Sequence, residues 1–329
     1  MKFATYKDAS RDGQLLVVAR DLLSAHYATG IANTLQQVLQ DWNFMAPQLQ
    51  DLYEQLNNGR ARHAFPFEPE RCMAPLPRAG QWVSSAAFTS HVERLRQAAQ
   101  VDLPKNFSTE PLLYQGRSDG FSGPCDDMVV QEWAQDIDFE AAIAVISADL
   151  PMGATPERAL DGVRLLLLAN DLCLRRTMAA ELASGAGWVG GKPATAFSPV
   201  AITPDEVGQG WSQGRLKLRL QSTLNGRKFG LCDAGADMRF HFGQLLSQLC
   251  KTRPVSAGSI IGSGPVSNQD SAQGFSCVAE KRAFETLQDG KAKTRFLKPG
   301  DSIRIEVKGA NGQSLFGAIE QTLVALALD

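Results

Sequence analysis

Residues 137–146, with the sequence IDFEAAIAVI, are the stretch from which we infer the fold of this chain. Successive side chains of a β-strand point to opposite faces, so residues two apart share a face. In this stretch Asp138, Glu140 and Ala142 fall on one face, and large apolar residues fill the other. The stretch therefore predicts a strand that carries two acids on one side.

Apolar patterns further along predict more strands. Residues 165–169 form a continuous apolar run, typical of a central strand, which would deliver Asn170 and Asp171 to its end. Leucines alternate with polar residues over 216–221, and Asn225-Gly226 then favours a type I′ hairpin. Apolar and polar residues also alternate over 303–308, which predicts another strand. Asn311-Gly312 then favours a turn, and residues 315–319 are expected to form the strand that pairs with 303–308. Residues 76–329 are thus expected to form a β-rich domain.

The first 75 residues have a different character. Residues 15–19 predict a buried strand, and leucines spaced by three, four and seven residues from Leu35 to Leu56 predict a helix that Pro47 should kink or restart. Four prolines between residues 64 and 80 indicate a boundary near residue 75. The overall prediction is an α+β, β-rich fold with a small α+β domain at 1–75 followed by the domain at 76–329.

Two short helices are expected within the second domain. Thr155-Pro156-Glu157 has the cap residue, the first-turn proline and the first-turn acid of a helix start. Apolar residues between Phe240 and Leu249 fit a short amphipathic helix.

Composition excludes several classes of function. The 329 residues carry a formal net charge of -2 without a block of like charges, which argues against nucleic-acid and membrane-surface partners. No apolar core of a signal peptide and no span long enough to cross a bilayer is present. Six cysteines occur without a C-x-x-C pair, which argues against zinc sites and disulfide frameworks. We expect a cytoplasmic protein.

Glu140 and Asp171 are the acids that the predicted strands would bring together. A hard divalent cation such as Mg²⁺ or Mn²⁺ takes oxygen ligands that converge from separate elements. Either acid alone is a weak indication, because most acids on strands are simply solvated. Asp171 is better placed, since it ends a strongly apolar strand where it needs a partner.

Five motifs give the chain a resemblance to a known family. They are residues 138–142 (DFEAA), 169–171 (AND), 192–199 (KPATAFSP), 224–226 (LNG) and 262–264 (GSG), in this order. Over roughly residues 78–325 the chain resembles the fumarylacetoacetate hydrolase family. The resemblance implies a mixed β-sandwich or β-roll C-terminal domain, a small separate N-terminal domain, and a homodimer.

The resemblance also implies a catalytic centre. Glu140 and Asp171 would hold Mg²⁺ or Mn²⁺, which would polarise the keto-enol oxygens of the substrate. Lys192 would stabilise the developing oxyanion. His91 would deprotonate water, and Glu93 is the acid that would accompany it, although a spacing of two residues points their side chains apart on a helix.

A small anionic diketo acid is the implied substrate. Tyr114 and Arg117 match a family segment that binds the substrate carboxylate, a group that a guanidinium fits well. Thr195 and Ser263, which belong to two of the motifs above, are the other expected substrate-binding residues.

Three departures from the family pattern qualify these expectations. Ala142 stands where the family has a second metal-binding glutamate, so that the ion could be weakly bound or absent; a natural and an engineered origin of this alanine both remain open. Pro265 stands where a threonine is common. The segment after Asp171, residues 175–178, lacks a glutamine that many relatives carry.

Three functions remain open. The leading hypothesis is a hydrolase acting on carbon–carbon bonds in ketonic substances, with an acylpyruvate or a fumarylacetoacetate-like compound from aromatic catabolism as substrate. The second is a decarboxylase or isomerase of a keto acid on the same fold. The third is a catalytically weakened homologue that binds a metabolite or a partner protein, and Ala142 is its main support.

Overall fold

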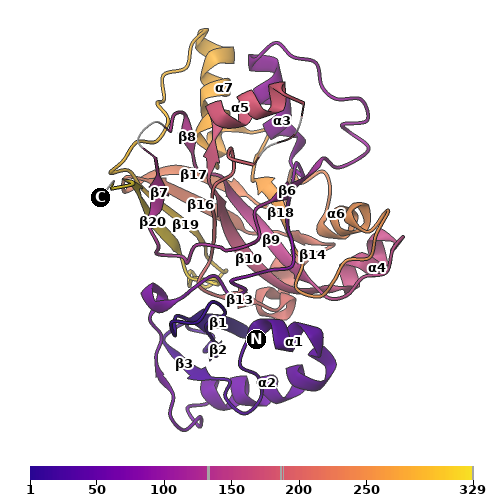
Figure 1. Ribbon diagram of the computed structural model, residues 1–329, viewed down its shortest axis with the longest axis vertical. Helices are drawn as coiled ribbons and strands as arrows, with labels where there is room; N and C mark the ends of the chain where they lie inside the picture. Colours follow the sequence, from indigo (N-terminus) through magenta and orange to yellow (C-terminus); the bar gives the residue numbers. More distant parts are fainter. Residues whose placement is uncertain (132–133, 186, 188, 328–329) are drawn as a thin grey trace.

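The computed structural model describes residues 1–131, 134–185, 187 and 189–327. The N-terminal segment forms one layer of strands covered by two helices, at the bottom of Figure 1. Its elements are β1 (Lys2–Tyr6), β2 (Gln14–Val18), β3 (Ser24–Tyr27), α1 (Leu35–Gln40), α2 (Trp42–Asn57) and β4 (Phe65–Pro66). Thr34 caps α1 in a capping box with Gln37, which explains why the helix begins there.

These strands continue into a sheet of the larger segment. Its order is β4-β3-β2-β1-β13-β10-β9-β18-β5-β6, with β12 also paired to β10. All its neighbours are antiparallel except β18 and β5. The added strands are β5 (Trp82–Ser85), β6 (Leu113–Gly116), β9 (Ala141–Ser147), β10 (Val163–Asp171), β12 (Thr195–Phe197), β13 (Ala201–Ile202) and β18 (Ile260–Pro265).

A second sheet has the order β17-β16-β19-β20-β7. Its strands are β7 (Met128–Val130), β16 (Arg219–Leu224), β17 (Arg227–Asp233), β19 (Ser302–Val307) and β20 (Ile319–Ala325). Two further pairs join β8 (Ile137–Asp138) to β11 (Cys173–Leu174) and β14 (Trp211–Ser212) to β15 (Arg215–Leu216).

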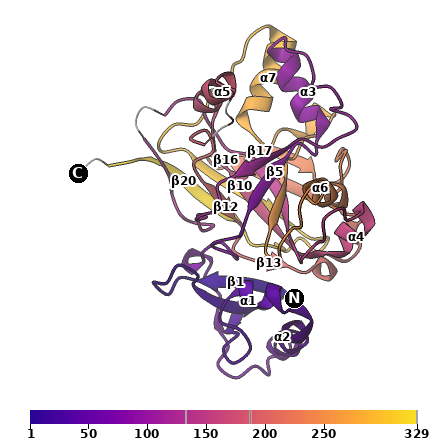
Figure 2. The ribbon, with the colours of Figure 1, turned by 45° about the vertical axis from the view of Figure 1, so that its right-hand side comes forward.

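Helices gather in two places outside the sheets. At the end away from the N-terminal segment lie α3 (Thr89–Ala98), α5 (Arg175–Ala183) and α7 (Val278–Asp289), as Figures 1 and 2 show. On the flank lie α4 (Pro156–Asp161) and α6 (Phe242–Leu249), which pack against each other. Short 3-10 turns occur at Pro69–Arg71, Pro204–Gly210 and Ser271–Gln273. Across the residues that the structure describes, no helix combines the length and apolar character needed to span a bilayer.

Most of the expected elements are confirmed, together with the α+β class. The apolar run 165–169 is the buried centre of β10, and Thr155 caps α4. At the hairpin between β16 and β17, Asn225 and Gly226 have φ values of 50° and 72°, as a type I′ turn requires.

Three details of the prediction are wrong. Residues 137–146 form two strands, because the chain changes partner at Phe139-Glu140. No new helix starts at Pro47, which lies inside α2; the helical stretch is interrupted earlier, at Asp41. Ala46 and Leu49, on either side of the proline, are buried and hold this part of α2 against the core. The strand that pairs with β19 starts only at Ile319.

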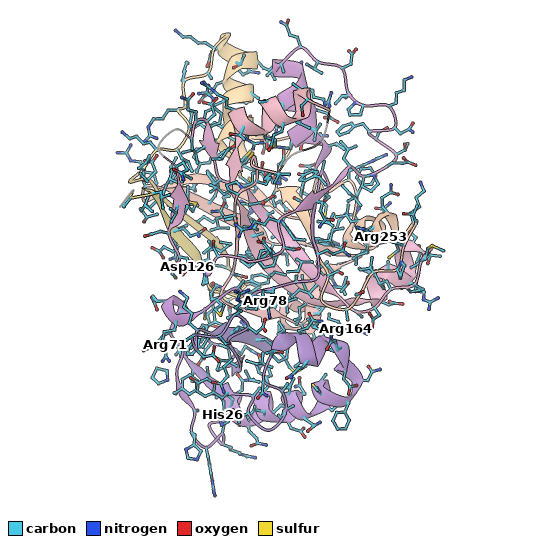
Figure 3. All side chains as sticks on the ribbon, viewed as in Figure 1. His26, Arg71, Arg78, Asp126, Arg164 and Arg253 are labelled. Atoms are coloured by element: carbon cyan, nitrogen blue, oxygen red, sulfur yellow. The ribbon has the colours of Figure 1, made fainter. Side chains whose placement is uncertain are left out.

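The core continues across position 75. One apolar cluster joins Phe3 and Leu15 of the N-terminal segment to Trp82, Ala142 and Phe197. The junction also carries polar contacts: Asp126, labelled in Figure 3, pairs with Lys7 at 2.6 Å, and the guanidinium of Arg164 lies 5.8 Å from the ring centroid of Trp42. The two segments therefore share one hydrophobic interior.

Candidate active site

Strand pairing brings Glu140 and Asp171 together. The register of β9 and β10 places Asn170 opposite Ala141, so the residues beyond this pair, Asp171 and Glu140, meet at the strand ends. The backbone N–H of Asp171 donates to the carbonyl oxygen of Glu140 at 3.0 Å. Both carboxylates are only 3% exposed, so each requires a charged or hydrogen-bonding partner.

Lys192 lies between these two carboxylates. Its Nζ is 2.6 Å from Oε2 of Glu140 and 3.0 Å from Oδ2 of Asp171, and it also donates to the backbone oxygen of Asp171. The hydroxyl of Thr195, on β12, donates to the other oxygen of Asp171 at 2.7 Å. One buried ammonium thus bridges the two acids that the sequence places 31 positions apart (171 − 140).

Arg175 adds a second cation on the other side of Glu140. This first residue of α5 places Nη2 2.7 Å from Oε1 of Glu140 and 2.8 Å from Oδ2 of Asp138. Asp138 in turn accepts the backbone N–H groups of Val278 and Ala279 at the start of α7, a favourable place for an anion. The guanidinium is therefore held in a fixed position.

Burial and charge act against each other in this network. Burial alone would raise the pKa of Glu140, but Lys192 and Arg175 outweigh it and lower this pKa to about 2. Asp171 has a longer contact to Lys192, and its burial raises its pKa. Burial opposes the charge of Lys192, yet the two acids hold its pKa well above the usual range. Lys192 is accordingly an ammonium at neutral pH.

His91 forms a separate pair with Glu280. On α3, Nδ1 of His91 lies 3.0 Å from Oε2 of Glu280, which α7 supplies. Ser267 and Arg94 hold the other oxygen of Glu280. Although burial would raise the pKa of Glu280, the bonds from His91, Ser267 and Arg94 lower it, so that this residue is a carboxylate.

The predicted acid partner of His91 is wrong. Glu93 is exposed on α3, and in the described part of the chain the acid that contacts His91 is Glu280. His91 and Glu280 are 189 residues apart in the sequence and meet because α3 packs on α7. No local spacing could therefore have indicated this pair. Arg175 was missed too, although its place four residues after Asp171 was a usable signal.

One cavity of about 440 Å³ joins these groups. The polar part of its wall comprises His91, Arg96, Tyr114, Glu140, Arg175 and Lys192. Most of its remaining wall is apolar and includes Ala86, Val92, Leu95, Leu112, Leu113, Met178 and Leu182. This is the mixture expected of a site for a small organic anion, in which a few polar groups orient a largely enclosed ligand.

The other predicted substrate-binding residues have different surroundings. Tyr114 is half-buried in the wall of the cavity, where its hydroxyl donates to the backbone oxygen of Ser85, and the loss of solvent around the hydroxyl raises its pKa. Arg117 lines a neighbouring hollow that also touches Lys192, and its guanidinium pairs with Asp119 at 2.6 Å. Ser263 lies outside the described lining of the 440 Å³ cavity; its hydroxyl bonds to backbone groups of β9 and β18.

Two departures noted in the sequence are neighbours in space. Ala142 is paired in register with Ala169 on one side and with Pro265 on the other. It is 1% exposed and belongs to the apolar cluster of Trp82 and Phe197. A methyl group thus faces a packed apolar layer where the family pattern has a carboxylate.

Family comparison agrees with the motifs. Residues 1–78 match the fumarylacetoacetase N-terminal domain 2, and residues 81–324 match the fumarylacetoacetate (FAA) hydrolase C-terminal domain. The chain belongs to the fumarylacetoacetate hydrolase family. A comparison with curated proteins gave no match.

Solved structures share the fold of this family member over its whole length. Fumarylacetoacetate hydrolase from Exiguobacterium antarcticum has a TM-score of 0.67 at 16% identity, over 99% of this chain and 100% of that one. Maleylpyruvate hydrolase from Sphingobium sp. SYK-6 gives 0.66 at 14%, over 99% and 100%. 2-Hydroxyhepta-2,4-diene-1,7-dioate isomerase from Mycobacterium marinum gives 0.63 at 12%, over 100% of both chains. The fold therefore serves hydrolases and isomerases alike.

A metal centre of the expected kind does not fit the residues present. Maleylpyruvate hydrolase has been solved in complex with manganese(II) and pyruvate. Here the four side-chain oxygens of Glu140 and Asp171 are all engaged by Lys192, Arg175 and Thr195, and an ion bridging the two acids would have to displace the ammonium of Lys192. Two carboxylates could serve Mg²⁺ or Mn²⁺ if they were free, but these are not.

A different set of potential ligands surrounds His91. In the described part of the chain, His91, Cys277 and Glu280 offer a nitrogen, a sulfur and an oxygen within 4.8 Å of one another. Hard ions prefer oxygen alone, and burial raises the pKa of the Cys277 thiol well above its usual range. This group does not fit Mg²⁺ or Mn²⁺ either.

Proposed function

We propose that this family member is a hydrolase that cleaves a carbon–carbon bond in a β-diketo acid of the acylpyruvate or fumarylacetoacetate type. The observation that carries the proposal is the placement of a histidine–glutamate pair and two fixed cations around one cavity. The shared fold of fumarylacetoacetate hydrolase and maleylpyruvate hydrolase supports this class of reaction.

His91 is the proposed general base. The carboxylate of Glu280 accepts a hydrogen bond from the Nδ1–H group of His91, which leaves Nε2 with a free lone pair. Nε2 removes a proton from water, and the resulting hydroxide attacks the acyl carbonyl carbon of the substrate. Glu280 stabilises the imidazolium that forms.

Lys192 and Arg175 are the proposed electrostatic stabilisers. When the bond between the acyl carbon and the methylene carbon breaks, its electron pair moves into an enolate whose oxygen carries negative charge. Cations that the fold already holds in position stabilise such charge strongly, because they need not reorganise as it develops. The imidazolium of His91 then returns its proton to the methylene carbon, so that one water and one diketo acid give two acids.

Acylpyruvates of different chain length, with fumarylacetoacetate, form the test panel. We expect the enol absorbance to fall with enzyme, mass spectrometry to find two acids, and His91→Gln to lose this turnover. A product of unchanged mass would favour an isomerase, and loss of carbon dioxide a decarboxylase. Binding of panel members without turnover would favour the weakened homologue, and each of these three results would overturn the proposal.

A further inference from the structure

We infer that this family member binds no divalent ion at Glu140 and Asp171, and that the ammonium of Lys192 occupies the cation position between them. The inference concerns which cation the carboxylates bind, and it can be tested whether or not the proposed substrate is right.

The first argument is the position of Nζ. It is within 3.0 Å of one oxygen from each carboxylate, so the ammonium fills the space between the two acids. The side chain of Lys192 is 6% exposed, so water does little to weaken its contacts with the two carboxylates. An ion and this ammonium would repel each other strongly at such a distance in a buried setting.

The second argument is that the surrounding groups are fixed. Asp138 holds Arg175 against Glu140 and is itself held by the start of α7, while Thr195 holds Asp171. The carboxylate oxygens that do not contact Lys192 therefore accept hydrogen bonds from donors that are themselves held in place. Each acid is satisfied by the chain's own side chains, as buried charges must be.

The third argument comes from Ala142. A carboxylate at this position would add a third anionic ligand next to Glu140. The chain instead places a methyl group there, packed in an apolar layer and paired with Pro265, the second residue that departs from the family pattern. The site therefore lacks the third anionic group that would favour a divalent ion over the ammonium.

The assignment predicts how keto-acid oxygens are held. An ammonium offers three N–H donors and one positive charge, which suits the carbonyl or enolate oxygen of a keto acid. Lys192 itself then polarises that oxygen, and chelators leave the protein unchanged.

Manganese binding provides the test, with the free ion followed by electron paramagnetic resonance on the full chain. We expect the unmodified protein, dialysed against a chelator, to bind no stoichiometric Mn²⁺ up to about 1 mM. Lys192→Met frees both carboxylates and should bind Mn²⁺ at least about tenfold more tightly. Lys192→Met combined with Glu140→Gln is the matched control and should lose that gain.

Two results would overturn the assignment. One is stoichiometric, micromolar Mn²⁺ binding by the unmodified protein. The other is a folded Lys192→Met variant, judged by circular dichroism, that gains no affinity. If Lys192→Met does not fold, Lys192→Gln replaces it with the same expected gain, and a failure to gain again counts against the assignment. None of these measurements depends on turnover, so an error in the proposed substrate would not be mistaken for an error in the assigned cation.

Discussion

Ala142→Glu restores the carboxylate that the family pattern places at this position. In the absence of an ion, the new side chain must enter a packed apolar layer at a residue that is 1% exposed. Overpacking costs about 1–3 kcal/mol, and a buried charge without a partner costs about 3–5 kcal/mol. We expect the two effects to overlap and the free energy of unfolding to fall by about 3–5 kcal/mol.

Manganese should recover much of this loss in the variant, because three carboxylates favour the two positive charges of the ion over the single charge of Lys192, which the ion would displace. An ion present at about 100 times its Kd stabilises the folded state by about 2.7 kcal/mol. For domains of this size each kcal/mol changes Tm by about 2–4 °C, so Mn²⁺ should raise the Tm of Ala142→Glu by about 5–10 °C. The unmodified protein, in which Lys192 already occupies the carboxylates, should change by less than about 1 °C.

Thermal unfolding with and without Mn²⁺ measures both numbers. Ala142→Gln is the control, because it has the same bulk without the charge and should be destabilised yet indifferent to the ion. Equal stabilisation of the unmodified protein and the variant would refute the reasoning. So would a folded Ala142→Glu variant that ignores Mn²⁺, since the missing acid would then not be the reason for the missing ion.

Three further predictions concern the acids and their partners. Glu280→Gln should lower kcat by about 100-fold or more in an assay of the proposed hydrolysis, whereas Glu93→Gln should leave kcat within about twofold; equal losses would deny the pairing seen in the structure. The unfolded chain protonates Glu140 near its ordinary pKa of 4.5 and the folded chain only near 2, so stability should fall as pH drops through this window. Urea midpoints against pH measure this effect, and Glu140→Gln should flatten the curve. Thr195→Val keeps the side-chain shape but removes a donor to buried Asp171, so it should cost about 1–3 kcal/mol by urea unfolding, and a neutral result would mean that water replaces the hydroxyl.

Much of the fold was accessible from local patterns. The apolar run of β10, the Asn225-Gly226 turn and the Thr155 cap each follow from short-range chemistry, and the structure confirms them. The motif order was enough to identify the family. These features depend on residues close in the chain, where the periods of strands and the geometry of turns act directly.

The site was less accessible because its contacts are distant in sequence. Glu140, Asp171 and Lys192 were all singled out, but the position of the ammonium between the acids depends on the register of β9, β10 and the segment before β12. Glu280 gave no local signal beside His91. Pro47 shows the reverse problem, in that burial of one helix face prevailed over a local helix-breaking preference.

The shared sheet also determines what happens if the chain is shortened. The pairing of β1 with β13 covers what would otherwise be the open border of the larger sheet. A protein that begins at residue 76 would expose unpaired backbone groups of β13 next to an uncovered apolar surface, and such borders recruit strands from other molecules. The N-terminal segment therefore protects this edge from pairing with other molecules. Its removal should lead to insoluble protein, even though every catalytic candidate would still be present.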